Sequence, residues 1–504
     1  MNTQLALVRT RARIGIQAPL VTVETHISNG LPSMSIVGLP EASVRESKDR
    51  VRAALAQSGF EFPLGRITIN LAPADIPKEG SRFDLAIALG ILAASGQLQQ
   101  NLLDEFEFFG ELALTGELRG ITGALPATLA ANKEQRAVVV PHINGAECAL
   151  VKQAKVYACN TLLDVINLIR ATERPAPFSF VENVELSNRI NLDLIDVKGQ
   201  QHGKRALEVA AAGGHNLLFI GPPGTGKTML AARLPGILPE LTDNEALEVA
   251  TIHSVAQGKI PTSLYARPFR NPHHTASAAA LVGGGSHPKP GEISLAHQGV
   301  LFLDELPEFN RSVLEVLREP LESGEIIISR ANKHVMFPAK FQLIGAMNPC
   351  PCGYAGDPTG RCRCTPEHVF KYRQKLSGPL LDRIDMHVEI PLLPHNELQK
   401  ANTGESSAEV LKRVQAARKL QQQRQHKANS QLTPREIDQF CSLDEKCNNI
   451  MQRAAEKLCL SARAYHRILR VARTLADLTE SNSISSQHIL EAINYRKLDR
   501  ASAG

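Results

Sequence analysis

The sequence predicts an α/β protein whose parallel sheet is preceded by an α+β region and followed by helices alone. Short apolar runs at 217–220, 300–303 and 341–346 alternate with helical patterns, as the strands of a parallel sheet do. A glycine-rich loop directly follows the first run, and beyond about Leu393 helical periodicity continues without strands. These three observations place a phosphate-binding type of sheet in the middle of the chain.

A chain of 504 residues exceeds the usual size of one domain, about 100–200 residues, so we expect three domains. Composition and pattern place them at 1–170, 188–395 and 396–504, with a proline-containing linker at 171–187. In the first domain, periodicity predicts strands at Ala18–Ile27, Ile67–Leu71 and Ala137–Val140, and helices at Ser43–Ser58 and Phe83–Ser95. In the last domain it predicts helices at Ser407–Gln425, Ser461–Leu478 and Ser485–Arg496.

Composition narrows the class of protein only a little. The formal net charge of +5 permits nucleic-acid binding without arguing for it. The N-terminal segment lacks the order of regions found in a signal peptide, and no apolar run reaches the roughly 18–20 residues of a membrane span. We therefore expect a cytoplasmic protein without a membrane partner, in which the nine cysteines are mostly reduced.

The segment 221–228 (GPPGTGKT) matches the phosphate-binding pattern G-x-x-x-x-G-K-[ST] in full. Its glycines let the backbone curl so that N–H groups point at phosphate oxygens, and the helix that follows adds its positive end. ATP and Mg²⁺ are the expected cofactors, with Lys227 on the β- and γ-phosphates and Thr228 on the metal ion. The expected nucleotide contacts are Gly221, Pro222, Pro223, Gly224, Thr225, Gly226, Lys227 and Thr228.

An acidic pair ends the second apolar run, at 300–305 (VLFLDE). At the phosphate edge of a parallel sheet, Asp304 would hold Mg²⁺ through water and Glu305 would polarise the water that attacks the γ-phosphate. Asn348 ends the third run, where it can reach the same water or the γ-phosphate. The pair is weak evidence alone, and the complete P-loop before it gives it weight.

Arg383 lies on a predicted short turn in the segment 378–385 (GPLLDRID). An arginine finger acts through its charge in the transition state and can come from another subunit. A salt bridge with Asp382 or Asp385 explains the same residue equally well. The residue pattern leaves both interpretations open.

Long segments of the chain resemble the ComM- and YifB-type, magnesium-chelatase-like branch of the AAA+ ATPases. The resemblance covers nearly the whole chain and implies an AAA+ core, a Lon-protease-like N-terminal domain and a C-terminal helical lid. The segments that carry it are 38–47 (GLPEASVRES), 70–75 (NLAPAD), 270–277 (RNPHHTAS), 291–306 (GEISLAHQGVLFLDEL), 348–353 (NPCPCG), 380–385 (LLDRID) and 461–467 (SARAYHR).

The resemblance also implies a function: a homo-hexameric ring that encircles single-stranded, forked or branched DNA. Members are taken to be branch-migration helicases, which extend homologous recombination during natural transformation. By carry-over, Asn348 is the sensor residue, Arg383 the finger that reaches a neighbouring subunit's γ-phosphate, and Arg463 the second sensor arginine. For Arg467 we prefer a solvated helix face.

Two inserts would face the ring pore in this family, one near 269–289 and one at 325–338. Arg270 and His273 in the first, and Arg330 and Lys333 in the second, are the candidate DNA contacts. The second insert has the alternating pattern of a hairpin with a basic tip, which would bind phosphates without distinguishing bases. Ordinary solvated loops remain the alternative for both.

The N-terminal resemblance to the Lon protease fold rests on 77–84 (PKEGSRFD) and 110–120 (GELALTGELRG). A Lon site uses a serine activated by a lysine. In alignment these two positions fall on Arg82 and Pro126, so we expect the fold without proteolysis. Ser81 with Lys78 or Lys133 is the remaining pairing that would support a protease.

Two closely spaced cysteine pairs bracket a turn-rich loop at 350–364. Four thiols at such spacing suit a tetrahedral Zn²⁺, although a one-residue spacer is tighter than usual, and free thiols or a redox pair remain open. His368 could replace one cysteine. The candidate zinc ligands are Cys350, Cys352, Cys362 and Cys364.

The leading hypothesis is an ATPase that drives DNA branch migration. The alternatives are a chelatase subunit that helps to insert Mg²⁺ into a porphyrin, an ATP-dependent protease, and a DNA-loading scaffold that binds ATP without turnover. An intact Glu305 argues against the scaffold, and Arg82 and Pro126 argue against the protease.

Overall fold

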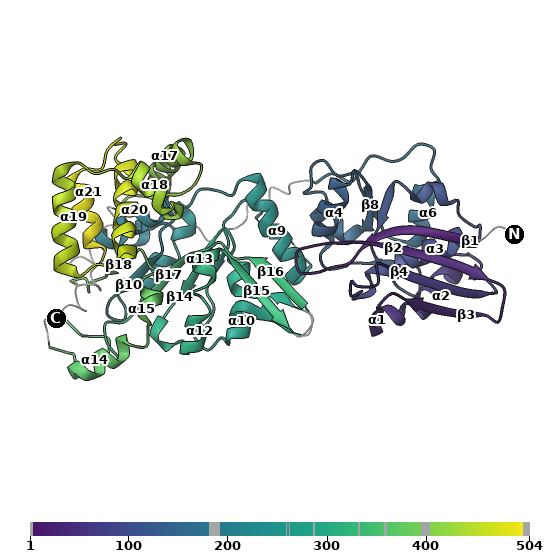
Figure 1. Ribbon diagram of the computed structural model, residues 1–504, viewed down its shortest axis with the longest axis horizontal. Helices are drawn as coiled ribbons and strands as arrows, with labels where there is room; N and C mark the ends of the chain where they lie inside the picture. Colours follow the sequence, from purple (N-terminus) through teal and green to yellow (C-terminus); the bar gives the residue numbers. More distant parts are fainter. Residues whose placement is uncertain are drawn as a thin grey trace.

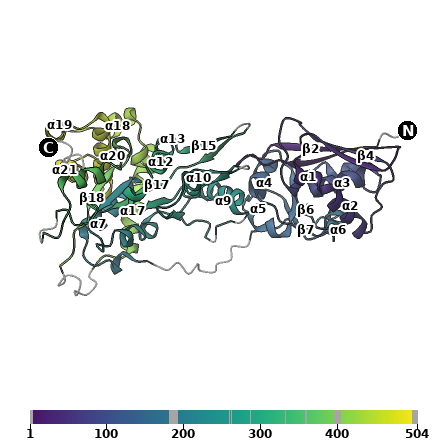
Figure 2. The ribbon, with the colours of Figure 1, turned by 90° about the horizontal axis from the view of Figure 1, so that it is seen from below.

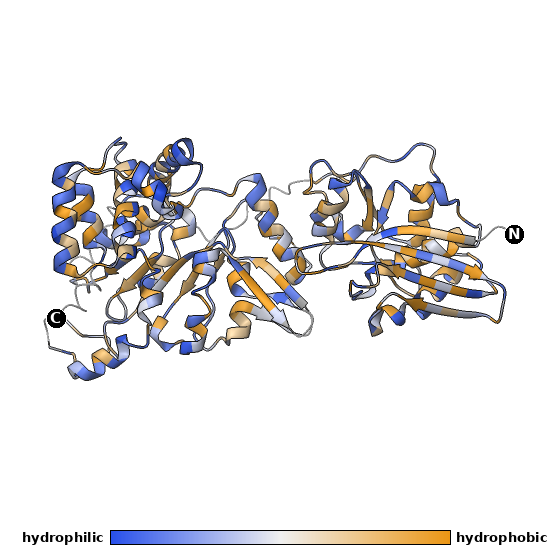
Figure 3. Ribbon diagram, in the orientation of Figure 1, coloured by the Kyte–Doolittle hydropathy of each residue, from blue (hydrophilic) through white to orange (hydrophobic). Residues whose placement is uncertain are grey.

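The computed structural model describes residues 4–180, 192–258, 260–261, 263–285, 288–330, 333–356, 360–394 and 404–496. The molecule is elongated, with the N-terminal region at one end, the parallel sheet in the middle and the C-terminal helices beyond it (Figure 1; Figure 2). Apolar residues concentrate in the strands, and the outer C-terminal helices alternate polar and apolar stripes (Figure 3).

The N-terminal region begins with a sheet in the order β1-β2-β4-β3, in which β3 runs parallel to β4 and the other neighbours are antiparallel. Exposed and buried residues alternate along β4 because helices cover only one face of the sheet. The covering helix α3 is buried along almost its whole length. These elements are β1 (Gln4–Arg11), β2 (Leu20–Ser28), β3 (Ser33–Val37), β4 (Arg66–Ala72), α1 (Ala42–Arg45), α2 (Ser47–Gln57) and α3 (Asp84–Ala94).

A second, parallel sheet follows in the order β5-β8-β9, with helices packed around it. Its elements, with a short β6–β7 ladder, are β5 (Phe106–Phe108), β6 (Glu111–Leu112), β7 (Leu118–Arg119), α4 (Ala124–Lys133), β8 (Ala137–Pro141), α5 (Gly145–Cys148), β9 (Val156–Cys159) and α6 (Leu162–Arg170). Residues 171–180 of the predicted linker carry no helix or strand, and its remainder lies outside the described residues.

The predicted N-terminal strands and helices form, with one difference. The helix expected over Ser43–Ser58 is interrupted at Glu46 and forms as α1 and α2. There the buried Ser47 hydroxyl donates a hydrogen bond of 2.6 Å to the carbonyl oxygen of Val44, which competes with the helical backbone pattern.

The central region contains a parallel sheet in the order β11-β14-β17-β10-β18, as the alternating pattern predicts. Every residue of β10, β14 and β17 is buried, since elements pack on both faces. The strands are β10 (Leu217–Ile220), β11 (Phe269–Arg270), β14 (Val300–Leu303), β17 (Gln342–Met347) and β18 (Met386–Glu389).

Helices and two small ladders surround this sheet. They are α7 (Gln201–Gly213), α8 (Lys227–Ala231), α9 (Asp243–Gln257), α10 (Ala278–Val282), β12 (Gly283–Gly284), β13 (Lys289–Pro290), α11 (Glu292–Leu295), α12 (Arg311–Glu315), α13 (Pro320–Ser323), α14 (Pro366–Arg373) and α15 (Gly378–Leu381). The predicted hairpin is confirmed as the antiparallel pair β15 (Glu325–Arg330) and β16 (Lys333–Pro338).

The C-terminal region is helical, as predicted. It contains α17 (Ser407–Gln425), α18 (Pro434–Phe440), α19 (Glu445–Leu458), α20 (Ala462–Leu478) and α21 (Ser486–Asn494), and the Ser485 side chain caps α21. Apolar residues of α17, α20 and α21 join one core cluster with α7 and with strands β10 and β14. Among the described residues, no helix is long and apolar enough to cross a membrane.

Candidate nucleotide-hydrolysis site

The P-loop begins where β10 ends and leads directly into α8. Gly224 and Gly226 adopt positive φ angles of 75° and 88°, which glycine adopts without steric cost. A Cβ at Gly221 would lie 2.3 Å from the carbonyl oxygen of Ile390, so the tight entry to the loop also requires glycine. The sequence pattern and the backbone therefore agree on a loop whose N–H groups can surround a phosphate.

Lys227 is held within this loop. Its Nζ donates to the carbonyl oxygens of Gly221 and Pro222 at 2.7 and 2.8 Å and to Asn348 Oδ1 at 3.2 Å. Burial lowers the pKa of Lys227, and Asp304 and Glu305 oppose that shift. An ammonium group buried among oxygen acceptors is well placed for a polyphosphate to replace them.

The strand order explains why Asn348 reaches the lysine. The strand β17 lies between β10 and β14, and its carboxyl end therefore projects between the P-loop and the acidic pair. Asn348, the residue directly after β17, occupies that gap. The sequence predicted that Asn348 would be close to the site but did not predict the strand order that places it there.

The acidic pair faces the first turn of α8. Thr228 Oγ1 donates to Asp304 Oδ2 at 2.6 Å, so a hydroxyl and a carboxylate converge where a Mg²⁺ ion would be held. The backbone N–H of Glu305 donates to Asp304 Oδ1 at 2.9 Å. Glu305 has a φ of 51°, an unusual conformation for a residue with a Cβ, and its side chain is half exposed.

The Glu305 carboxylate has a partner that the sequence did not predict. Nδ1 of His274 lies 3.3 Å from Glu305 Oε2, and the His274 ring packs against that of His273 with centroids 4.2 Å apart. The 270–277 segment thus reaches the acidic pair. Nothing in the sequence around His274 distinguishes a histidine that contacts Glu305 from a histidine in a solvated loop.

The two candidate arginines converge on another acidic residue, Glu322. Arg383 Nη2 lies 2.6 Å from Glu322 Oε1, and Arg463 Nη1 lies 3.8 Å from the same oxygen. Arg383 is buried and borders a pocket of about 350 Å³, which is lined by residues of α12, of α13 and of the segment between them. The predicted alternative partners of Arg383, Asp382 and Asp385, were therefore wrong, because Nη1 donates to the carbonyl oxygen of Pro379 at 2.6 Å and Nη2 faces Glu322 of α13.

Asp385 instead anchors the turn to the C-terminal helices. It is fully buried, accepts the backbone N–H of Asn216 at 2.8 Å, and forms an ion pair with Arg467 of α20. Burial alone would raise the pKa of Asp385, but Arg467 and His215 lower it well below its usual range. The expectation that Arg467 lies on a solvated helix face was wrong, because this buried carboxylate requires a counter-charge.

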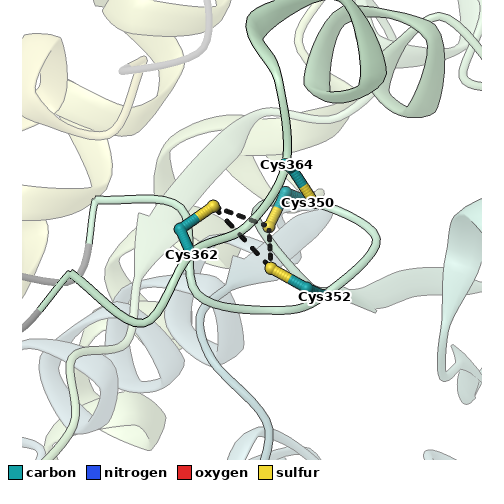
Figure 4. Close-up of side chains that lie close together, drawn as sticks. All are labelled: Cys350, Cys352, Cys362 and Cys364. Atoms are coloured by element: carbon teal, nitrogen blue, oxygen red, sulfur yellow. Dashed lines mark hydrogen bonds between the residues drawn. The ribbon is translucent and has the colours of Figure 1, made fainter.

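The four clustered cysteines lie together on the loop after Asn348 (Figure 4). All four sulfur atoms are within 4.8 Å of one another, and Sγ of Cys350 is 3.4 Å from that of Cys352 and 3.9 Å from that of Cys362. A tetrahedral ion with Zn–S bonds of about 2.3 Å places sulfurs about 3.8 Å apart, so the spacing fits. His368, the suggested replacement, is not part of this cluster.

This cysteine loop packs on the nucleotide site. A Cβ at Gly353 would lie 2.6 Å from Cδ of Pro223 in the P-loop. The pKa of the Cys352 thiol is lowered to about 6, chiefly because backbone N–H groups of Tyr354 and Arg363 donate to it. A metal ion bound there would stiffen the loop that supports both Asn348 and Pro223.

The candidate DNA contacts have mixed outcomes. Arg270 is engaged by Glu292 through two hydrogen bonds of 2.6 and 2.7 Å, and His273 bonds Thr275 within its own loop. The backbones of Arg330 and Lys333 pair across the hairpin, and their side chains lie outside the described residues.

The N-terminal positions that would form a Lon-type site have other partners. Ser81 donates to Glu111, and Lys78 donates to the carbonyl oxygen of Pro73. Arg82, at the nucleophile position, is buried, donates to the carbonyl oxygen of Gly123 at 3.3 Å and lies over the Phe109 ring. The Ser–Lys pairing that would have supported a protease is therefore not formed by Ser81 and Lys78.

Comparisons with known proteins agree with this arrangement. Residues 193–398 match the family described as "Magnesium chelatase, subunit ChlI", residues 23–144 match "Subunit ChlI of Mg-chelatase", and residues 404–496 match "Magnesium chelatase, subunit ChlI C-terminal". The chain is 54% identical to the competence protein ComM of Haemophilus influenzae and 52% identical to the protein YifB of Escherichia coli, in each case over 98% of both chains. A magnesium-chelatase 38 kDa subunit of Rhodobacter capsulatus is 28% identical over 30% of this chain and 49% of its own length.

Proposed function

The chain belongs to the ComM and YifB family of magnesium-chelatase-like AAA+ proteins, and from this we propose that it is an ATP-driven DNA motor. In this proposal it is a branch-migration helicase that acts in homologous recombination during natural transformation. The family implies ATP and Mg²⁺ as cofactors. The proposal of DNA branch migration is supported by the geometry of the site and by full-length similarity to a protein named for competence.

One observation carries the hydrolytic part of the proposal. Residues that follow three neighbouring strands form two hydrogen-bonded pairs, Lys227 with Asn348 at 3.2 Å and Thr228 with Asp304 at 2.6 Å. Bound Mg²⁺ would neutralise charge that develops on the phosphates. Thr228 and Asp304 would hold the ion, Lys227 would bind the β- and γ-phosphates, and Glu305 would accept a proton from the attacking water or orient it.

His274 would act on Glu305 before the nucleotide binds. With Nδ1 of His274 at 3.3 Å, the Glu305 carboxylate is turned toward the 270–277 segment. A water molecule in line with the γ-phosphate needs that carboxylate free. The segment thus links a candidate DNA-contacting loop to the residue that activates water.

The arginines support a site that is shared between subunits. Arg383 and Arg463 meet at Glu322, whereas the residues around Lys227 are joined to each other. We infer that a second copy of the chain presents its nucleotide to these arginines in a homo-hexameric ring. Heterologous contacts of this kind close into rings when the rotation between subunits allows it.

DNA would pass through the pore of that ring. The basic hairpin tip with Arg330 and Lys333, together with the Arg270–His273 segment, would contact phosphates without distinguishing bases. Single-stranded, forked and branched DNA are the proposed substrates. Arg270 would have to exchange Glu292 for a phosphate, and such an exchange keeps its bidentate geometry.

We further propose that the chain divides at 1–170, 188–395 and 396–504, with a linker at 171–187. In this division the N-terminal domain has a Lon-protease-like fold without proteolytic activity, and the C-terminal helices form the lid. Cys350, Cys352, Cys362 and Cys364 would bind one Zn²⁺, which would brace the loop between Asn348 and the P-loop. Emission spectrometry should find about one zinc per chain and much less in Cys352→Ser, and metal-free wild-type protein would refute the zinc site.

A strand-exchange assay tests the motor. Purified protein is incubated with a labelled four-way junction, with and without ATP and Mg²⁺. Wild-type protein should release product strands only with both cofactors, and Lys227→Ala and Glu305→Gln should release none. Intact junctions and forks with wild-type protein, alongside active ATP turnover, would refute the helicase and favour a chelatase-type ATPase.

A further inference from the structure

The connection between β1 and β2 extends well beyond their sheet. The backbone N–H of Ala12 donates to the carbonyl oxygen of Pro19 at 3.0 Å, and Ile14 and Gln17 exchange hydrogen bonds of 3.0 and 2.9 Å. Gly15 has a φ of 59°, a conformation that glycine favours in tight turns. The segment Ile14–Gln17, hereafter the N-terminal turn, is therefore a hydrogen-bonded projection of the N-terminal region.

The N-terminal turn packs on the β15–β16 hairpin. Gly15 is buried, and a Cβ at this position would lie 2.3 Å from Cγ1 of Val335 and 3.6 Å from Cζ of Phe337. Ile14 and Ile16 pack against the apolar cluster that contains Val335 and Phe337. Figure 1 shows the purple β1–β2 connection reaching toward β16 from the other end of the molecule.

The hairpin needs such a contact. A two-stranded ribbon is marginal on its own in water, and one face of this ribbon carries the half-exposed side chains of Ile327 and Met336. The other face, with Ile326, Ile328, Val335 and Phe337, is buried. The N-terminal turn supplies part of that cover from a different region of the chain.

A second contact ties the N-terminal region to α9. The backbone N–H of Gly123 donates to the carbonyl oxygen of Ser254 at 3.0 Å, and Leu125, Val151 and Ala250 form one apolar cluster. Arg13, beside the N-terminal turn, donates to the Thr122 hydroxyl. The turn is therefore fixed relative to α9 as well as to the hairpin.

The helix α9 in turn contacts the segment that leads into β14. Nδ1 of His297 accepts the backbone N–H of Lys340 at 3.1 Å, so its Nε2 carries the proton and donates to Glu248 of α9 at 3.0 Å. His297 shortly precedes β14, and Lys340 shortly follows β16. The His297 imidazole thus links α9 to the segment before β14 and to the segment after β16.

We propose that the N-terminal turn is a positioning element for the β15–β16 hairpin, so that the N-terminal region sets where the hairpin presents its tip to DNA. The DNA part of this inference rests on the proposed function, whereas the positioning part does not. Gly15 is the specific determinant, because any side chain there would displace Val335. The N-terminal region then serves the motor without any catalytic residue of its own.

The test uses Gly15→Ala, its partner variant Val335→Ala and the double variant. Val335→Ala removes Cγ1, the atom that the new Cβ would strike. Gly96→Ala is the matched control, because Gly96 also has a positive φ, 78°, but a Cβ there would have no neighbour within 4 Å. Hydrogen exchange of the hairpin amides is measured in all of them, together with ATP turnover with and without forked DNA.

Gly15→Ala should speed exchange at β15 and β16 by about fivefold or more and raise the DNA concentration for half-maximal stimulation by a similar factor. Turnover without DNA should stay at the wild-type level. Val335→Ala alone should also speed exchange, because it removes buried methyl groups from the covered face of the hairpin. The double variant should exchange no faster than the faster single variant, since the clash with Cγ1 is already gone, and Gly96→Ala should change neither value. Wild-type exchange in Gly15→Ala, or a double variant that shows the full sum of the two single effects, would overturn the proposal. Wild-type turnover that does not respond to DNA would refute the proposed function, while the exchange data still decide the positioning.

Discussion

The P-loop edge of the sheet and the arginine cluster at Glu322 are both rich in charge, but they differ in what one chain supplies. At the P-loop edge, Lys227 and Thr228 bond to groups on neighbouring strand ends. At the cluster, Arg383 and Arg463 share one half-exposed carboxylate. A single copy therefore brings the P-loop residues and the acidic pair together, while its two arginines are bound to a carboxylate. In the proposed ring, Glu322 would hold these arginines until a neighbouring subunit's phosphate replaces it.

The largest effect on the difference between the two sites should come from removing the P-loop lysine. Lys227→Ala should lower ATP turnover at least about 10⁴-fold, since the positive charge that binds the transferred phosphate is lost. A phosphate-release assay measures it. Lys371→Ala, which removes an exposed lysine paired with Glu367, should leave turnover unchanged, and residual activity in Lys227→Ala would place hydrolysis elsewhere.

Removing the finger candidate should act nearly as strongly without unfolding the protein. Arg383→Ala should lower turnover about 10³-fold, while ATP binding changes little because the P-loop is intact. The lost bonds to Glu322 and to the Pro379 carbonyl oxygen should lower the free energy of unfolding by about 1–2 kcal/mol. Binding of a fluorescent nucleotide and thermal melting check the second part. If Arg383→Ala retained wild-type turnover, Arg383 would have only a structural role, as the partner of Glu322.

How much the sequence could predict differs between the two sites for a physical reason. A P-loop is defined by local backbone requirements, so the sequence of Gly221–Thr228 predicted the loop conformation, which the positive φ angles of Gly224 and Gly226 confirm. The partners of Arg383 and Arg467 depend on which helices meet in space, and charge patterns along the chain do not encode that. The contact of His274 with Glu305 could not be predicted for the same reason. The sequence of the N-terminal turn is also like that of many short loops between strands, so its contacts with the hairpin could not be predicted.

The ion pair between Asp385 and Arg467 supports the arginine cluster from within the core. Arg467→Met should lower the free energy of unfolding by about 3 kcal/mol at neutral pH, because it leaves Asp385 buried without its counter-charge. Urea unfolding measures it, and Arg463→Met, whose side chain is exposed, is the control with a change below about 1 kcal/mol.

The pH dependence of this difference follows from the lowered pKa of Asp385. A carboxyl group whose folded pKa lies below its unfolded value, about 3.9, contributes stability that is present above the unfolded value and is lost as the pH falls through the folded one. The unfolded chains of the two proteins titrate alike, so the gap between them depends on the pKa of Asp385 in the two folded states. Without Arg467 the buried carboxyl protonates at a higher pH than in wild type, so the gap should be widest near neutral pH and narrow as the pH falls toward about 4 and below. A gap independent of pH would mean that the pair is held by packing alone.

The smallest predicted effect comes from releasing both arginines. Glu322→Gln removes the shared negative charge, so turnover at low protein concentration should rise about two- to threefold, while stability falls by about 1 kcal/mol or less because Glu322 itself is half exposed. Turnover measured across a dilution series checks this. A fall in turnover would show that Glu322 orients the arginines productively instead of withholding them.

The sharing of one site between two subunits is tested most directly by mixing two inactive variants. Lys227→Ala keeps its finger and Arg383→Ala keeps its P-loop, so in a mixed ring about one interface in four pairs an intact P-loop with an intact arginine. Turnover should reappear on mixing, peak near equal amounts and approach about one quarter of the wild-type value. No recovery at any ratio, with mixed assembly confirmed by light scattering and tagged pull-down, would contradict the shared site.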